Sequence, residues 1–169
     1  MRGGGRTRFG VLLRSDEPVD CTPSDVAFLR DEIGLRCVID VRGEAEHSPG
    51  LGHPLAEAGI EHLALDLTDI GVTPEEQQRV RELVDSQDES AALRWMTDRY
   101  LNRLDASGSR IVEILGHLVG GRVPALVHCV GGKDRAGLAV AMLLAAADVE
   151  NSAIVADYAL TEERMEALL

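Results

Sequence analysis

Residues 124–145 read PALVHCVGGKDRAGLAVAMLLA, and this stretch decides the fold. It begins with a short apolar run at 124–128, typical of a buried strand, and continues from Arg135 into an Ala- and Leu-rich segment typical of a helix. The loop between them leads from the carboxyl end of a strand to the N-terminus of a helix. Backbone N–H groups and the positive end of the helix dipole meet there, so the stretch predicts an anion-binding site.

The 129–135 loop combines a thiol, two cations and an acid. The helix N-terminus, Lys133 and Arg135 favour the thiolate form of Cys129, and a thiolate beside a bound phosphate is a nucleophile for phosphoryl transfer. Arg135 follows Cys129 by six positions, a spacing that lets its guanidinium group reach back and hold two phosphate oxygens. The residues predicted to bind phosphate are Val130, Gly131, Gly132, Lys133 and Arg135.

Two details of the loop narrow its function. Lys133 is the single lysine among 17 basic residues. A nucleotide-binding P-loop needs G-x-x-x-x-G-K-[ST], but Asp134 follows the lysine here and no glycine stands five positions before Gly132, which argues against an ATP or GTP site. The competing interpretation of Cys129 is a small apolar residue at a strand end, and the adjoining glycines and cations favour the functional interpretation.

The other cysteines, Cys21 and Cys37, lack these surroundings and are predicted to be structural. Three cysteines without metal-ligand spacing argue against both a disulfide scaffold and a zinc site.

Elsewhere, short apolar runs alternate with helical patterns, which predicts an α/β fold. We expect a central, mainly parallel sheet of about four or five strands flanked by helices. A flexible basic Gly-rich segment at 1–9 is expected to precede a single domain at 10–169, which is either a short form or truncated at both ends. Capping patterns at Thr22, Thr73 and Ser86 predict helix starts, and Gly34 predicts a helix end. The predicted strands are 10–14, 37–41, 62–67 and 124–128, and the later predicted helices are 75–84, 89–104, 109–119, 135–147 and 151–160. The stretch 71–105 has no strand pattern and is predicted to pack beside the sheet, where it could wall a site.

The chain has 169 residues and a net charge of −12. Such a surface repels nucleic acid and anionic membranes at long range, so a phosphate-bearing substrate must be captured by a local positive field. No apolar run is long enough for a signal peptide or a membrane span, so we expect a cytoplasmic protein without stable membrane association. The sequence does not indicate an oligomeric state.

The pattern from His128 to Gly137, HCxxGKDRxG, resembles the active-site signature of the bacterial tyrosine/serine protein phosphatase family with an HCxxGKDRTG loop, a family related to phosphoinositide phosphatases. Further similarities follow in the expected order. Arg14-Ser15-Asp16 resembles an RSD motif, Ile39-Asp40-Val41-Arg42 with Glu46 resembles a viDLRxxxE motif, and Asp157-Tyr158-Ala159-Leu160-Thr161 resembles a DYxxT motif.

The resemblance implies a two-step phosphatase reaction through a phosphocysteine on Cys129, without a metal or another cofactor. It implies Asp134 as the general acid, with Asp66 and Asp69 as alternatives that otherwise belong to a solvated turn. His128 is expected to tune the thiolate through hydrogen bonds. Arg42 and Glu46 are expected to form a structural salt bridge with each other. Packing and hydrogen bonding behind the loop are expected for Asp157 and Tyr158, and surface or packing roles for His47, His53, His62 and His117.

Two departures from the family pattern matter. Ala136 stands where the family has Thr or Ser, whose hydroxyl helps the thiolate leave in the second step, and the family's NFRDxGG-like opening is missing. The expected substrates are phosphorylated proteins or small phosphoesters, first phosphotyrosine, with phosphoserine, phosphothreonine and phosphoinositides as further candidates. Two alternative functions stay open, namely a low-turnover phosphate-binding pseudophosphatase and a rhodanese-like sulfurtransferase.

Overall fold

The computed structural model describes residues 4–47, 53–67 and 74–166. Its centre is a four-stranded sheet with the order β1-β4-β2-β3, in which all neighbouring strands run parallel. This confirms the predicted α/β fold. The last residue of β4, His128, pairs in register with Ser15 of β1 and Asp40 of β2, so the carboxyl ends of three strands meet. The strands are β1 (Leu12–Ser15), β2 (Cys37–Asp40), β3 (Glu61–Ala64) and β4 (Ala125–His128).

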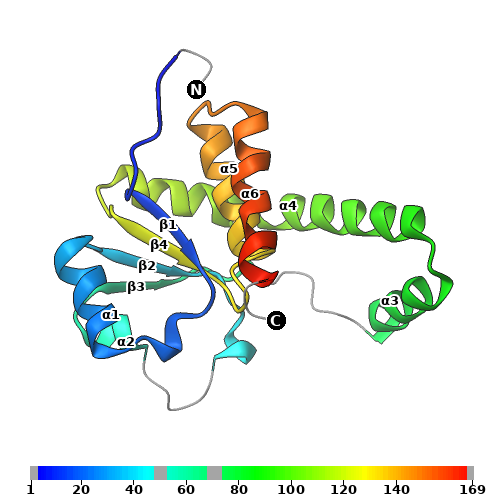
Figure 1. The fold of residues 1–169 in the computed structure, drawn as a ribbon, viewed down its shortest axis with the longest axis horizontal. Helices are drawn as coiled ribbons and strands as arrows, with labels where there is room; N and C mark the ends of the chain where they lie inside the picture. The colour runs from blue at the N-terminus through cyan, green and yellow to red at the C-terminus, as the bar shows by residue number, and fades with distance from the viewer. Residues whose placement is uncertain (1–3, 48–52, 68–73, 167–169) are drawn as a thin grey trace.

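Helices cover both faces of the sheet, as Figure 1 shows. Because side chains alternate along a strand, Ile39 and Val127 pack on one face with α4 and α5, whereas Val38 and Leu126 pack on the other with the α1 and α2 side. Strands buried on both faces explain the near-continuous apolar runs in the sequence. The helical elements are η1 (Pro18–Asp20), α1 (Pro23–Ala27), η2 (Phe28–Glu32), η3 (Glu44–Glu46), α2 (Pro54–Glu57), α3 (Pro74–Ser86), α4 (Glu89–Val119), α5 (Arg135–Ala146) and α6 (Asn151–Glu166).

The predicted helix starts have different outcomes. Thr22 forms the expected capping box with Asp25, and Gly34 has the positive φ of 70° that suits a glycine after a helix. The predicted box at Ser86 is wrong, because the cap of α4 is Asp88, whose carboxylate accepts from the N–H of Ala91. The box at Thr73 lies outside the described residues.

Helix α4 is continuous over 31 residues, so the two helices predicted at 89–104 and 109–119 are wrong. The gap between the two predicted helices, 105–108, contains Gly108. A glycine inside a helix costs about 1 kcal/mol relative to alanine, and burial offsets this cost, since Ser107, Ile111 and Ile114 are buried against the body. Helix α6 also runs further than predicted, to Glu166.

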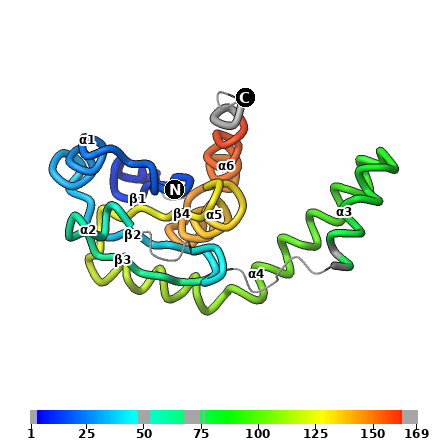
Figure 2. Tube along the Cα trace, turned by 90° about the horizontal axis from the view of Figure 1, so that it is seen from below, coloured from blue at the N-terminus to red at the C-terminus, as the bar shows by residue number. Residues whose placement is uncertain are grey.

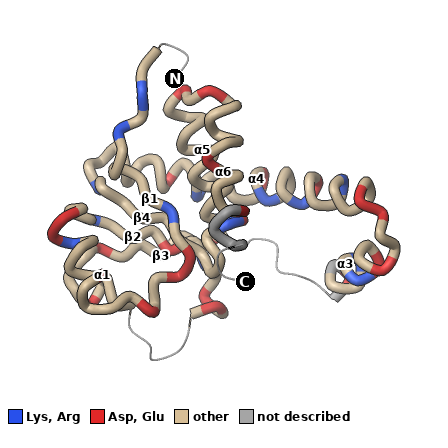
Figure 3. The backbone as a smooth tube through the Cα atoms, viewed as in Figure 1, with Lys and Arg blue, Asp and Glu red and all other residues tan. Residues whose placement is uncertain are grey.

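The N-terminal half of α4 leaves the body of the molecule and carries α3 away from the sheet, as Figures 1 and 2 show. The predicted helical segment beside the sheet is therefore only partly correct, because α3 projects outward. Figure 3 shows acidic residues gathered at the junction of α3 and α4. Within the described residues, none of the helices combines the length and the apolar character needed to cross a bilayer.

Candidate active site

The 129–135 loop connects β4, a central strand, to α5. Cys129 at its base is 3% exposed, whereas Val130, Gly131 and Lys133 lie at the surface. The N–H of Glu17 donates to the carbonyl of Val130 at 3.0 Å and so ties the loop to the segment after β1. The predicted nucleophile therefore sits at the floor of a loop held between two strand ends.

Gly132 is the position where the loop requires a glycine. Its φ is +63°, and a Cβ there would lie 2.5 Å from the backbone carbonyl of Ser15 and 2.6 Å from the nitrogen of Asp16. The backbone of the loop thus passes directly over the end of β1, an approach that any side chain would prevent. Gly131 has no such constraint, because a Cβ would meet nothing within 4 Å.

The loop backbone is arranged to receive an anion. Among the hydrogen bonds of the described residues, the N–H groups of residues 130–134 have no protein acceptor, and α5 begins at Arg135. Unpaired N–H groups at the positive end of a helix dipole form a natural phosphate site. Phosphate binding by Val130, Gly131, Gly132 and Lys133 stays a prediction.

Arg135 is oriented by Glu46, which follows β2 in the chain. Both terminal nitrogens of the guanidinium group donate to the Glu46 carboxylate, one of them at 2.7 Å. This pairing raises the pKa of Arg135 despite its burial and holds the pKa of Glu46 below its usual value. Two of the five N–H bonds of the guanidinium are used in this way, so three remain for a ligand.

The predicted salt bridge between Arg42 and Glu46 is wrong, because each side chain has a different partner. Arg42 is paired with Asp40, at 2.7 Å between Nη2 and Oδ2, and with Glu17, while Glu46 holds Arg135. Burial opposes ionisation of Asp40, yet His62 and Arg42 hold the pKa of Asp40 well below its usual range.

Asp134 is bonded to a residue that the sequence analysis did not single out. The hydroxyl of Tyr100, on α4, donates to Oδ1 of Asp134 and lies 3.0 Å from the hydroxyl of Tyr158 on α6. Burial, followed by the Asp134 and Tyr158 contacts, raises the pKa of Tyr100 far above that of a free phenol. Three helices therefore meet at the carboxylate predicted to be the general acid.

Tyr158 also explains Gly137, the last glycine of the motif. A Cβ at Gly137 would lie 2.7 Å from Cε2 of Tyr158, so the tyrosine ring packs directly on the first turn of α5. The packing role predicted for Tyr158 is confirmed.

Arg14, at the end of β1, joins the loop to α6. Its guanidinium donates to the carbonyl of Gly132 at 2.9 Å, to the hydroxyl of Thr161 at 2.6 Å and to the carbonyl of Asp157 at 3.0 Å. The RSD and DYxxT segments thus support the loop from behind. The hydrogen bonding predicted for Asp157 is confirmed, and it is made by the backbone carbonyl of this residue.

The remaining candidates have mixed outcomes. Asp66 is exposed after β3, and its charge contributes to the raised pKa of Arg135, so it lies near the loop. Asp69 lies outside the described residues. Ala136 is fully buried and belongs to the core beneath the loop.

His128 is buried and its Nδ1 lies 3.2 Å from the carbonyl oxygen of Cys129. Because a carbonyl only accepts, Nδ1 carries the proton of this hydrogen bond. The expected hydrogen bonding therefore reaches the backbone of the nucleophile. Burial lowers the pKa of His128.

The other thiols differ from Cys129. Cys37 is fully buried in β2, and burial raises its pKa to about 11. Burial and the charges of Asp25, Asp16 and Asp20 raise the pKa of Cys21. Among the described residues, the charge of Arg122 alone opposes the rise in the pKa of Cys37, and none opposes it for Cys21.

Helix α4 also supplies Arg103, a second residue that sequence reasoning missed. Burial lowers the pKa of Arg103, and the nearby charges of Arg99 and Arg135 lower it further. Its Nε is buried and has no hydrogen-bond partner among the described residues. Tyr100 and Arg103 lie three positions apart, on one face of a helix, and this periodicity is the sequence signal that could have paired them.

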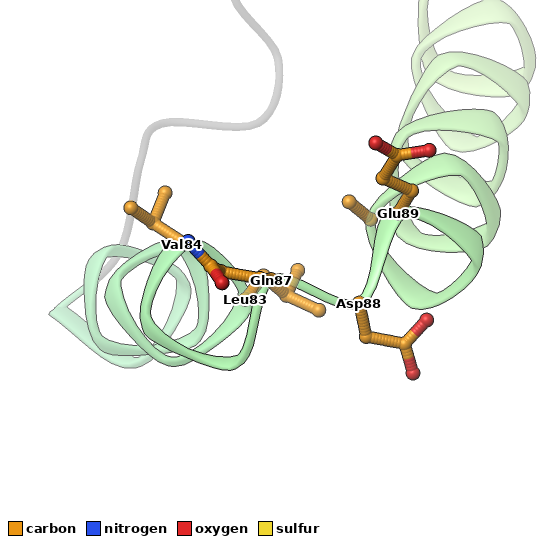
Figure 4. A pocket seen from close by; sticks show the side chains of 6 residues that line it. Leu83, Val84, Gln87, Asp88 and Glu89 are labelled. Atoms are coloured by element: carbon orange, nitrogen blue, oxygen red, sulfur yellow. The ribbon is translucent and has the colours of Figure 1, made fainter.

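A hollow at the junction of α3 and α4 is unsuited to phosphate. Figure 4 shows its lining, in which Leu83 and Val84 stand on the α3 side and Asp88 and Glu89 on the α4 side. It lies on the projecting arm, away from the β4–α5 connection (Figure 1). Two carboxylates without a cation among the lining residues repel a phosphate ester, so the 129–135 loop is the better candidate.

Comparison with known proteins agrees with this site. A family model described as the tyrosine phosphatase family matches residues 1–169. The triple specificity protein phosphatase PtpB of Mycobacterium tuberculosis is 41% identical over 70 residues, which cover 40% of this chain and 25% of that protein. A protein of Cupriavidus necator named as a tyrosine-protein phosphatase is 30% identical over 169 residues, 96% of this chain and 57% of that protein. The chain thus spans less than two thirds of either relative. The motif, the loop geometry and the match along the whole chain lead to one conclusion: the chain belongs to the tyrosine phosphatase family.

Proposed function

We propose that the protein is a cysteine-dependent phosphatase that hydrolyses phosphomonoesters through a phosphocysteine on Cys129. The observation that supports this most directly is the arrangement of Arg135. Glu46 fixes its guanidinium beside a loop whose N–H groups are without protein acceptors. Preorganised donors of this kind stabilise the charge that develops on a transferring phosphoryl group.

In the first step, the Cys129 thiolate attacks phosphorus, the S–P bond forms and the bond to the leaving oxygen breaks. Asp134 supplies the proton that this oxygen needs. Its carboxyl group stands at the start of α5 and is held by the Tyr100 hydroxyl. The loop N–H groups and Arg135 bind the three non-bridging oxygens throughout.

In the second step, the Asp134 carboxylate left by the first step takes a proton from water and the water oxygen forms a bond to phosphorus. The S–P bond breaks, and its electron pair returns to sulfur. A hydroxyl at position 136 would assist the departing thiolate, but Ala136 has none. We therefore predict slow hydrolysis of the phosphoenzyme, seen as a burst of product in the first turnover. Ala136→Ser, which adds one oxygen at this buried position, and Ala136→Thr should raise the steady-state rate. Unchanged rates and no burst in the wild-type protein would count against this step.

Phosphotyrosine is the first substrate class to test, because the family is named for it. The triple specificity of the mycobacterial relative is the reason to test phosphoserine, phosphothreonine and phosphoinositide substrates beside it. Lys133 and Arg103 add positive charge near the loop, and this charge would attract the phosphate group of any of these substrate classes.

The decisive experiment measures hydrolysis of para-nitrophenyl phosphate and phenyl phosphate by the wild type and by Cys129→Ser, Asp134→Asn and Asp66→Asn. Cys129→Ser should abolish turnover of both. Since general acid catalysis contributes roughly 10²–10⁴-fold and matters most for a poor leaving group, Asp134→Asn should depress phenyl phosphate hydrolysis far more than nitrophenyl phosphate hydrolysis. If Asp66→Asn shows that pattern instead, Asp66 is the acid.

The same proteins separate the alternative functions. Tight binding of phosphate or phosphopeptide without turnover above background in the wild type would identify a pseudophosphatase. Thiosulfate:cyanide transfer that exceeds phosphatase activity and depends on Cys129 would identify a sulfurtransferase. Either outcome would overturn the proposed reaction.

A further inference from the structure

Four of the five histidines gather beneath the 129–135 loop, around the carboxylate of Asp40. His62 Nε2 and His128 Nε2 both lie 3.6 Å from Asp40 Oδ2, and His47 Nε2 lies 3.4 Å from it. The His53 ring stands 4.7 Å from the His62 ring and 5.4 Å from the His128 ring, measured between centroids. The sequence analysis assigned His47, His53 and His62 to surface or packing positions, gave His128 a role in tuning the thiolate, and expected no metal.

The ring nitrogens in this cluster are buried without hydrogen-bond partners. Within the described residues, this holds for both nitrogens of His53 and for the Nε2 atoms of His47, His62 and His128. His128 is the decisive case because its side chain is 0% exposed. Its Nδ1 proton is donated to the Cys129 carbonyl, so the neutral ring directs a lone pair from Nε2 toward the anionic oxygen of Asp40. A cation between the two lone pairs would stabilise this buried contact, and 3.6 Å is longer than the hydrogen bond that a proton on Nε2 would make to Asp40.

The spacing of the atoms suits a small tetrahedral ion. Bonds of 2.0–2.1 Å at tetrahedral angles place neighbouring ligand atoms about 3.3–3.4 Å apart. The distances from Asp40 Oδ2 to the His62 and His128 nitrogens, both 3.6 Å, are close to that value. One ligand atom from each of His53, His62 and His128 lies within 4.8 Å of the others, a separation that a bound ion would shorten.

The surrounding charges also favour a cation. Arg42 donates to both oxygens of Asp40 and to Glu17. Two carboxylates against one guanidinium leave a net formal charge of −1 beside the imidazoles. Imidazole nitrogens are typical ligands of zinc, copper, nickel and iron, whereas magnesium and calcium prefer oxygen.

We propose that His53, His62 and His128, with Asp40 Oδ2 as the fourth ligand, bind one zinc ion at the base of the catalytic loop. Four protein ligands leave no open position, so the ion is structural. It links the ends of β2 and β4 with β3 and with the start of α2, directly behind the nucleophile. The hydrogen bond from His128 Nδ1 to a backbone carbonyl is the outer contact that metal-bound histidines typically make. The proposal does not depend on the proposed phosphatase activity.

The test begins with the full chain treated with a chelator and dialysed, then titrated with Zn²⁺ and with Co²⁺. One equivalent should bind. Co²⁺ should give the intense visible bands of a tetrahedral complex, and free zinc at a hundredfold excess over its Kd should raise the midpoint of thermal unfolding by roughly 5–10 °C.

Variants locate the ion. His53→Gln and His62→Gln, at partly exposed positions, should each lose the zinc-dependent rise and the cobalt bands, whereas His117→Gln, on α4, should keep both. Cys129→Ser should also keep both, which separates this site from zinc captured by the reactive thiol. The proposal would be overturned if zinc did not bind stoichiometrically or if the cobalt spectra were octahedral. Equal binding by the wild type and His62→Gln would overturn it as well. Loss of binding in Cys129→Ser would do so too.

Discussion

Gly132 shows how a single residue fixes the loop. Replacing it with alanine forces a non-glycine residue to φ +63° and places a Cβ 2.5 Å from the backbone of Ser15. The φ value alone costs about 1–3 kcal/mol, and the clash adds to it. We expect Gly132→Ala to lower the midpoint of thermal unfolding and to abolish phosphatase activity.

Gly131→Ala is the matched control for this prediction. Its Cβ meets nothing within 4 Å and its φ is not in the left-handed region. The unfolding midpoint of Gly131→Ala should stay within about 1 °C of the wild type, equivalent to less than about 0.5 kcal/mol. Equal destabilisation by both substitutions would show that the close approach of Gly132 to Ser15 is not the cause of the lost stability.

The Glu46–Arg135 pair predicts a dependence of stability on pH. Arg135 holds the pKa of Glu46 below its ordinary value, with burial opposing. The pair therefore stabilises the fold fully above the ordinary glutamate pKa of about 4.3, and this contribution is lost as the pH falls through the lower folded-state pKa. The difference in urea midpoint between wild type and Glu46→Gln should accordingly be largest near pH 6 and shrink toward pH 3.

Activity provides a second measurement on Glu46→Gln. Loss of a hydrogen-bonded charge that positions Arg135 is worth about 1.5–3 kcal/mol, so kcat/KM should fall roughly 10–100-fold. A urea-midpoint difference that does not change with pH would contradict the assigned role of the ion pair.

At the scale of single residues, the sequence predicted those site residues that are close to one another in the chain. Cys129 and Arg135 stand within one loop, and their spacing is visible without a structure. Glu46 is separated from Arg135 by 89 positions, and Tyr100 from Asp134 by 34. Such partners are selected by the packing of β2 and α4 against the loop, which no local pattern encodes.

At the scale of elements, two glycines in helices predict opposite effects. Gly108 lies inside α4, and a Cβ there meets nothing within 4 Å, whereas a Cβ at Gly137 in α5 would lie 2.7 Å from the Tyr158 ring. Alanine removes the conformational penalty of glycine in a helix, which is about 0.5–1 kcal/mol. Gly108→Ala should therefore raise the unfolding midpoint by roughly 1–4 °C, and Gly137→Ala should lower it.

A double-mutant cycle identifies the cause of the second effect. If the clash with the tyrosine ring is responsible, Tyr158→Ala should relieve much of the loss in Gly137→Ala, giving a coupling free energy of about 0.5–3 kcal/mol. Simple additivity of the two substitutions would indicate that the ring moves aside without cost.

Among the elements, sequence reasoning predicted the strands well but not the length of α4. The four strands were predicted within a few residues because their apolar runs are short and bounded. The helices predicted at 89–104 and 109–119 are one helix, because burial of Ser107 and Ile111 outweighs the low helix propensity of Gly108 between them. The length of α4 is therefore decided by its packing against the sheet, which involves residues far apart in the sequence.

For the whole molecule, the net charge of −12 opposes the local field of the loop. A phosphopeptide with basic flanking residues should be attracted to the surface, and one with acidic flanking residues should be repelled. We expect kcat/KM at low ionic strength to be higher for the basic peptide, and the difference to narrow in about 0.5 M salt, where screening shortens the range of these interactions to a few ångströms.

The control is para-nitrophenyl phosphate, which has no flanking charges and should respond little to the same salt. A preference for acidic peptides, or a difference that survives high salt, would mean that contacts at the loop rather than the global charge control substrate choice.

Arg14 has a consequence for how the protein is made. Its guanidinium group bridges Gly132 of the loop to Thr161 of the last helix, 147 positions later in the chain. At ribosomal rates of roughly 5–20 residues per second, the two ends of this bridge are synthesised about 7–30 s apart. During that interval the nascent chain comes to contain the nucleophile before it contains α6, which supplies two of the three acceptors of Arg14. Biosynthesis thus delays completion of the loop until α6 has been made.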